Sequence, residues 1–148
     1  NTTDKLSYFR DISTFGGCLA APAAALENIR IIEEENLLDN VVAMGDYLQK
    51  GLQDLLSFSK VGDVRGKGLL QGIEFVEDKA SKQPLAEEKV IAVCGAMAKR
   101  GVLVGRTNRS FAGRNNVVNL APAYIVTREQ IDTILTALRE SITEVLGK

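Results

Sequence analysis

The hydrophobic period of this chain changes between residues 57 and 69, and that change limits the possible folds more than any other feature. Before it, apolar residues recur every three or four positions, which predicts a helix over 38–57. After it, Leu69, Ile73 and Phe75 alternate with outward-facing residues, which predicts a strand over 69–76. The glycine-rich stretch 61–68 separates the two patterns. A chain that moves from helix to strand in this way is typical of an α/β domain.

Further helices and strands are predicted from the same periods and from signals at element ends. They are helices over 19–36, over 86–100 and after 127, and strands over 102–104 and 117–121, with a polar loop over 106–116. Pro22 lies in the first turn of its helix, where a missing N–H costs nothing. Gly101 is expected to end the third helix, and Thr127 with Gln130 forms a capping box for the last.

This order predicts an α/β (α+β) sandwich, in which a small, mainly antiparallel sheet carries helices on one face. The helix over 86–100 is expected to bury four residues, Val90, Ile91, Cys94 and Met97. The Ala-rich helix near the N-terminus has a narrow face of small residues. We expect it to be a helical arm that packs outside the core formed by the strands. We therefore assign 1–36 to a lead-in and helical arm and 37–148 to the small domain.

Composition excludes several classes of function. The 148 residues are 45% hydrophobic and 25% charged with a formal net charge of -1, which fits a globular domain with a core. A near-neutral charge and 5% aromatic residues give no footprint for nucleic acid, and no apolar run is long enough for a membrane span. The polar start resembles no signal peptide, and two distant cysteines predict a reducing cytoplasm. The absence of histidine excludes histidine-based nucleophilic triads and imidazole metal sites.

The segment Ser13-Thr14-Phe15-Gly16-Gly17 is the best candidate for a binding site. It places hydroxyl groups and a glycine pair just before a helix. Glycines permit close approach by a ligand, and a helix N-terminus favours a phosphate. The alternative is that Thr14 is only the N-cap of the following helix.

Three motifs, in order, carry a resemblance to a known family. They are 13–17 with the helix segment 23–35, the glycine-rich 61–69, and 120–132. Together they resemble the C-terminal part of class III, pyridoxal-phosphate-dependent aminotransferases over about residues 9–146. Residues 10–18 and the loop 105–116 are most similar to the branch that uses taurine or other ω-amino acids with pyruvate.

The resemblance implies the small C-terminal domain of a fold-type-I enzyme that moves an amino group from an ω-amino acid or amine to pyruvate. It implies a cytoplasmic homodimer and small-molecule substrates. The family's Schiff-base lysine lies in a larger preceding domain, so the chain alone is expected to be inactive. Lys67 lies in the family's Arg-Gly-Lys-Gly turn and is not expected to be that lysine.

The resemblance also implies roles for individual residues. Thr14, with Ser13 beside it, matches the position that contacts the cofactor phosphate from the neighbouring subunit. Arg106 matches a mobile arginine that captures the acid group of the substrate, and Arg109 and Arg114 lie in the same loop. A planar bidentate donor suits a carboxylate or sulfonate. The alternative for all three arginines is a solvated basic loop.

Two other functions stay open at this point. The first is a stand-alone, non-catalytic α/β module for dimerisation or ligand sensing. The second is a binding protein for small anions that uses the arginine loop alone.

Overall fold

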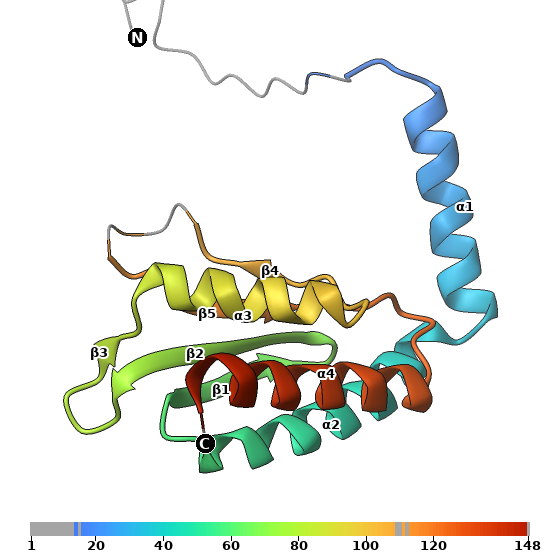
Figure 1. Ribbon diagram of the computed structural model, residues 1–148. Helices are drawn as coiled ribbons and strands as arrows, with labels where there is room; N and C mark the ends of the chain where they lie inside the picture. The colour runs from blue at the N-terminus through green and yellow to red at the C-terminus, as the bar shows by residue number, and fades with distance from the viewer. Residues whose placement is uncertain (1–13, 15, 109–110, 112, 148) are drawn as a thin grey trace, which may run out of the picture. The chain divides into compact units, whose positions relative to one another are not determined.

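The chain divides into two compact units, Asn1–Glu35 and Asn36–Lys148, in a computed structural model that describes residues 14, 16–108, 111 and 113–147 (Figure 1). The boundary expected from the sequence lies one residue away, between 36 and 37. That the first unit is an arm for a preceding domain stays a prediction.

The first unit is built on helix α1, Ala20–Glu34, which has no buried residue. Its N-cap is Leu19, which makes no side-chain cap hydrogen bond. Pro22 lies in the first turn, as expected. Arg30 Nε donates to Glu27 at 2.8 Å and the same guanidinium pairs with Glu34 one turn later, which supports the helix along its surface.

The second unit contains an antiparallel sheet with helices on one face, which confirms the predicted fold class (Figure 1). The sheet order is β1-β2-β5-β4, with β3 paired to β2. The strands are β1 Val61–Lys67, β2 Leu70–Asp78, β3 Gln83–Pro84, β4 Gly105–Arg106 and β5 Val117–Leu120. The helices are α2 Leu37–Gln53, the 3-10 helix η1 Asp54–Ser57, α3 Glu87–Lys99 and α4 Arg128–Leu146.

The core lies between the helices and the inner face of the sheet. Alternate strand residues point into it, among them Val64, Ile73, Phe75, Val118 and Leu120. On the outer face, Arg65 Nη1 donates to Asp63 at 2.7 Å and to Glu74 at 2.6 Å. Arg65 therefore ties two strands together on the uncovered face.

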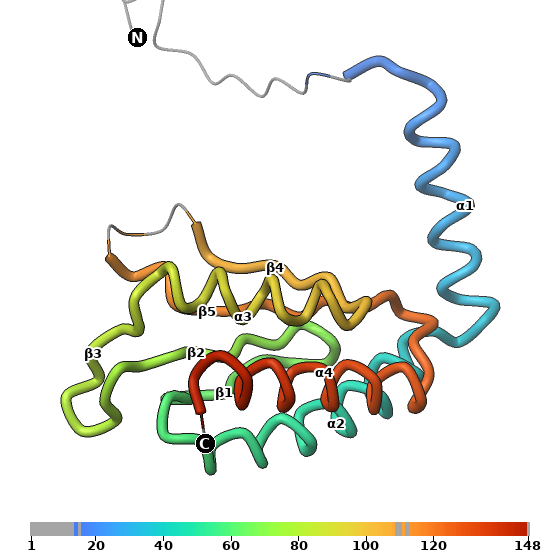
Figure 2. Tube along the Cα trace, viewed as in Figure 1, coloured from blue at the N-terminus to red at the C-terminus, as the bar shows by residue number. Residues whose placement is uncertain are grey.

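Helices α2 and α4, from opposite ends of the second unit, lie side by side (Figure 2). Glycines set the packing of α2. A Cβ on buried Gly45 would lie 2.5 Å from the Cα of Gly68, which has a φ of +56° in the turn between β1 and β2. The helix can thus approach the backbone of this turn only because Gly45 has no Cβ.

Two local expectations were wrong. The strand expected over 102–104 forms at Gly105–Arg106 instead, and Leu103 is 88% exposed. Antiparallel register would set 102–104 against the end of β5 and Pro122, which has no N–H to donate. In α3, Ile91 is 45% exposed while Val93 is buried. Ile91 lies about 100° around the helix from Val90, away from the arc that Val93 and Met97 share.

Candidate functional site

Arg106 lies in strand β4 and not in the polar loop to which the sequence assigned it. Its backbone pairs with Val118 of β5, and the next residue, Thr107, donates its N–H to the carbonyl of Val117 at 2.9 Å. The strand pairing therefore holds the backbone of Arg106 itself and of Thr107, the residue after it. Any change of position by this group is therefore a rotation of the side chain.

The guanidinium of Arg106 contacts the start of helix α3. Its Nη1 donates to Glu87 Oε1 at 2.7 Å and to the Thr107 carbonyl at 3.0 Å. The side chains of Arg106 and Glu87 are 26% and 36% exposed, so the pair lies at the surface but is partly screened from water. Every hydrogen bond that Arg106 makes to the described residues comes from Nη1, which leaves Nε and Nη2 able to donate to a ligand.

Glu87 is fixed from a second direction by Asn115. The Asn115 Nδ2 donates to Glu87 Oε2 at 3.2 Å, while its buried Oδ1 has no partner among the described residues. Hydrogen bonds from Asn115 and Arg106 lower the pKa of the Glu87 carboxyl. The carboxylate stays charged at neutral pH, and the contact is lost only as the pH falls through this lowered pKa.

Sequence reasoning missed both Glu87 and Asn115. Glu87 is an acidic residue in the first turn of a helix, where the helix dipole alone explains it. Asn115 is one polar residue among many in its loop. Glu87 comes from α3 and Asn115 from the loop before β5, so only the folded arrangement of these elements around β4 brings them to Arg106.

The other arginines do not join this cluster in the part of the chain that is described. Arg114 is exposed, and its backbone N–H donates to the Phe111 carbonyl at 2.9 Å. Arg109 lies outside the described residues.

Thr14 lies in an exposed turn of the first unit, and Ser13 lies outside the described residues. Helix α1 begins at Ala20 with Leu19 as its N-cap, so the alternative that Thr14 caps this helix is wrong. Gly17 has a φ of +85°, and a Cβ there would meet nothing within 4 Å. Thr14 is therefore exposed, and the backbone at Gly17 has open space around it.

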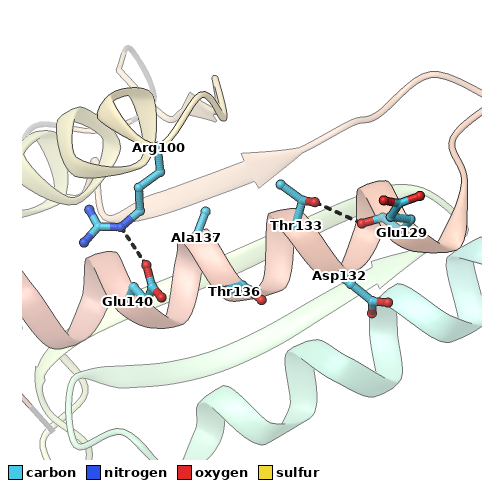
Figure 3. Close-up of a pocket in the computed structure, with 7 residues that line it drawn as sticks. All are labelled: Arg100, Glu129, Asp132, Thr133, Thr136, Ala137 and Glu140. Carbon is cyan, nitrogen blue, oxygen red and sulfur yellow. Dashed lines mark hydrogen bonds and ion pairs between the residues drawn. The ribbon is translucent and has the colours of Figure 1, made fainter.

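A hollow of about 400 Å³ runs along α4, and none of the predicted site residues lines it (Figure 3). Its lining includes the acidic residues Glu129, Asp132 and Glu140. Arg100 at its edge already pairs with Glu140 at 3.1 Å and with Glu144 at 2.7 Å. An acidic substrate would be repelled here, so Arg106 is the better candidate for binding an acid group.

Over the described residues, none of the helices has the length and apolar character to cross a membrane.

Known proteins resemble this chain over nearly its whole length. It is 53% identical over 145 residues to the hypotaurine/taurine–pyruvate aminotransferase of Paracoccus denitrificans, covering 97% of this chain and 32% of that protein. It is 52% identical to the taurine–pyruvate aminotransferase of Bilophila wadsworthia, covering 98% of this chain and 32% of that protein. The chain thus spans about a third of the length of these relatives.

Solved structures agree with the sequence comparison. An aminotransferase from Bacillus anthracis has a TM-score of 0.87 at 39% identity, covering 97% of this chain and 32% of that one. The model of the class-III aminotransferase family matches residues 4–142. Because the match in sequence covers most of both units and the fold is that of known aminotransferases, the chain belongs to the class-III aminotransferases.

Proposed function

We propose that the chain is the C-terminal small domain of a pyridoxal-phosphate-dependent aminotransferase, which moves an amino group from an ω-amino acid or amine to pyruvate. The observation that carries this proposal is the 53% identity, over 97% of the chain, to a relative named for taurine, hypotaurine and pyruvate. The relatives give no support to a stand-alone sensing module or a simple anion-binding protein. A cytoplasmic location belongs to the same proposal, supported by Cys18 and Cys94, which are both free thiols.

The segment around Thr14 fits the phosphate of this cofactor. A hydroxyl that is not used as a helix cap can donate to a phosphate oxygen, and the open backbone at Gly17 lets the group approach. We propose that Thr14, with Ser13 beside it, contacts the phosphate held by the neighbouring subunit of a homodimer. When bound, pyridoxal phosphate supplies the electron sink for amino-group transfer.

Arg106 is proposed to bind the acid group of the substrates. An amino donor and a keto acid use a single pocket in turn, so a shared donor must recognise both. The guanidinium has Nε and Nη2 available for a bidentate contact with a carboxylate or sulfonate. Because β4 fixes its backbone, Arg106 orients the acid group by turning its side chain alone.

Kinetics of the full-length enzyme test this function. We expect the wild type to make alanine from pyruvate and an ω-amino acid, and Arg106→Ala to raise the pyruvate KM. The loss in kcat/KM should be about 10–100-fold, on the scale of one charge-assisted pair. Amines without an acid group should be affected much less.

Arg109→Ala and Arg114→Ala serve as controls for the charge of the loop. A large, acid-selective loss in Arg109→Ala instead of Arg106→Ala would show that Arg109, and not Arg106, is the arginine that binds the acid group. Equal small losses in all three variants would support the solvated basic loop.

A further inference from the structure

We infer that Glu87 and Asn115 hold Arg106 in a resting position and so set the preference of the site between acidic and non-acidic substrates. This inference rests on the proposed function, because it concerns the arginine that binds the acid group. It adds two residues, from α3 and from the loop before β5, that act through Arg106 and do not themselves touch the substrate. They are therefore positioning residues.

The contact between Arg106 and Glu87 is one-sided. Only Nη1 reaches the carboxylate, at 2.7 Å, whereas a substrate acid group can accept from two nitrogens at once. The pair is also 26% and 36% exposed, and ion pairs at such sites are weak. A bidentate acid group held away from water therefore competes successfully for Arg106, and a neutral group does not.

Asn115 keeps the carboxylate ready for the return of the arginine. It holds Glu87 Oε2 at 3.2 Å and leaves Oε1 turned toward Arg106. A glutamate is charged at neutral pH, and hydrogen bonds from Asn115 and Arg106 lower the pKa of Glu87 further. The side chain of Arg106 thus has a defined place to stay when a substrate carries no acid group.

The resting contact of Arg106 with Glu87 lowers the apparent affinity of the site for acids and raises it for amines without an acid group. An acid binds only the fraction of molecules in which Arg106 has left Glu87, so its apparent affinity falls by that fraction. A plain amine gains, because the guanidinium stays out of the pocket. Weakening the resting contact should therefore raise the affinity for substrates with an acid group and lower the affinity for substrates without one.

The test compares full-length holoenzyme with its Glu87→Gln and Glu88→Gln variants. Glu88 is the matched control, since it lies in the same first turn of α3 and is exposed. Calorimetric titration with propanoate, which has no keto group and cannot react, measures acid binding directly. Kinetics with 3-aminopropanoate and propylamine, which differ by the acid group, measure the preference.

We expect Glu87→Gln to lower the propanoate Kd by about 2- to 5-fold, as suits a partly exposed ion pair. The KM for 3-aminopropanoate should fall and the KM for propylamine should rise. Asn115→Ala should give a smaller shift in the same direction, and it tests the inference even if Glu87→Gln does not fold. The shift should vanish in an Arg106→Ala background, since the effect acts through that arginine.

Equal propanoate affinity in Glu87→Gln and Glu88→Gln would overturn the inference. Weaker propanoate binding in Glu87→Gln would also overturn it, because Glu87 would then hold Arg106 in its binding position. If the wild type did not transfer amino groups to pyruvate, the proposed function would fail. The titration with propanoate would still decide whether Glu87 restrains Arg106.

Discussion

Thr14 and Thr127 have the same side chain in two different settings. Thr127 caps α4: its hydroxyl accepts from the Gln130 N–H at 3.3 Å, and the Gln130 side chain accepts from the Thr127 N–H at 2.9 Å. Thr14 lies in a turn six residues before α1 begins and does not cap it. The first threonine is thus available for a ligand, whereas the second stabilises the fold.

This contrast predicts opposite effects of one substitution in the full-length enzyme. Thr14→Val should weaken retention of pyridoxal phosphate, because a hydrogen bond to a charged group contributes about 1.5–3 kcal/mol. Thr127→Val should leave the cofactor bound and lower the free energy of unfolding by about 1 kcal/mol through loss of the cap. Cofactor titration and denaturant unfolding of both variants measure the two effects. Unchanged cofactor affinity together with lower stability in Thr14→Val would rule out the phosphate contact.

The sequence allows a side-chain contact to be predicted when the two partners are close along the chain. The capping box of Thr127 and Gln130 needs only a spacing of three, and it is confirmed. The contact of Arg106 with Glu87 joins residues 19 positions apart across a strand and a helix. No local pattern encodes it, because it depends on how the start of α3 lies against β4 in the fold.

At the scale of elements, Gly45 lowers the intrinsic stability of helix α2 but allows that helix to pack closely against the turn between β1 and β2. Alanine in place of glycine favours an isolated helix by about 1 kcal/mol. Here, however, a Cβ would meet the backbone of Gly68 at 2.5 Å, and that turn is already constrained by its positive φ. Backbone cannot move aside as a side chain can, so packing decides the outcome.

We therefore expect Gly45→Ala to lower the free energy of unfolding by about 1–3 kcal/mol, the usual cost of overpacking. Gly95 in α3 is the matched control, since nothing lies within 4 Å of a Cβ added there. Gly95→Ala should raise stability by about 0.5–1 kcal/mol. Denaturant unfolding of the two variants measures the difference. A stabilised Gly45→Ala would mean that α2 does not pack against the turn between β1 and β2.

Element type followed from the sequence more reliably than element position. The periods of α2 and α4 are long and regular, so both helices form where they were expected, although α2 ends at Gln53 and Asp54–Ser57 continue as a 3-10 helix. The short strand near 103 was misplaced, because three apolar residues form a strand only where a partner strand can bond to them. In β5 that partner ends at Leu120, just before Pro122.

At the scale of the whole molecule, the chain spans about a third of the length of the relatives it matches. The second unit has its own core between three helices and one face of a sheet. It presents Arg106 at a strand end, and the first unit presents Thr14. Both are proposed binding groups, and both proposals come from the resemblance carried by three motifs in order. Their relation in space depends on parts of the enzyme that no pattern in this chain describes.

We expect this chain alone to have no transaminase activity. Its proposed groups orient and bind, and no lysine in it matches the family's Schiff-base position. Lys67 is exposed at the end of β1, where it pairs with Leu70 across the hairpin. An exposed lysine in a hairpin has no enclosed pocket around it to orient a cofactor on its amine.

The test is to incubate the chain with pyridoxal phosphate, reduce it with borohydride and locate the modified lysines by mass spectrometry. We expect only partial labelling spread over several surface lysines, and no alanine formed from pyruvate. The full-length enzyme is the control and should carry the label on one lysine, outside residues 1–148 of this chain. Complete labelling of a single lysine within this chain, Lys67 above all, would show that the lysine of the reaction lies in this domain after all.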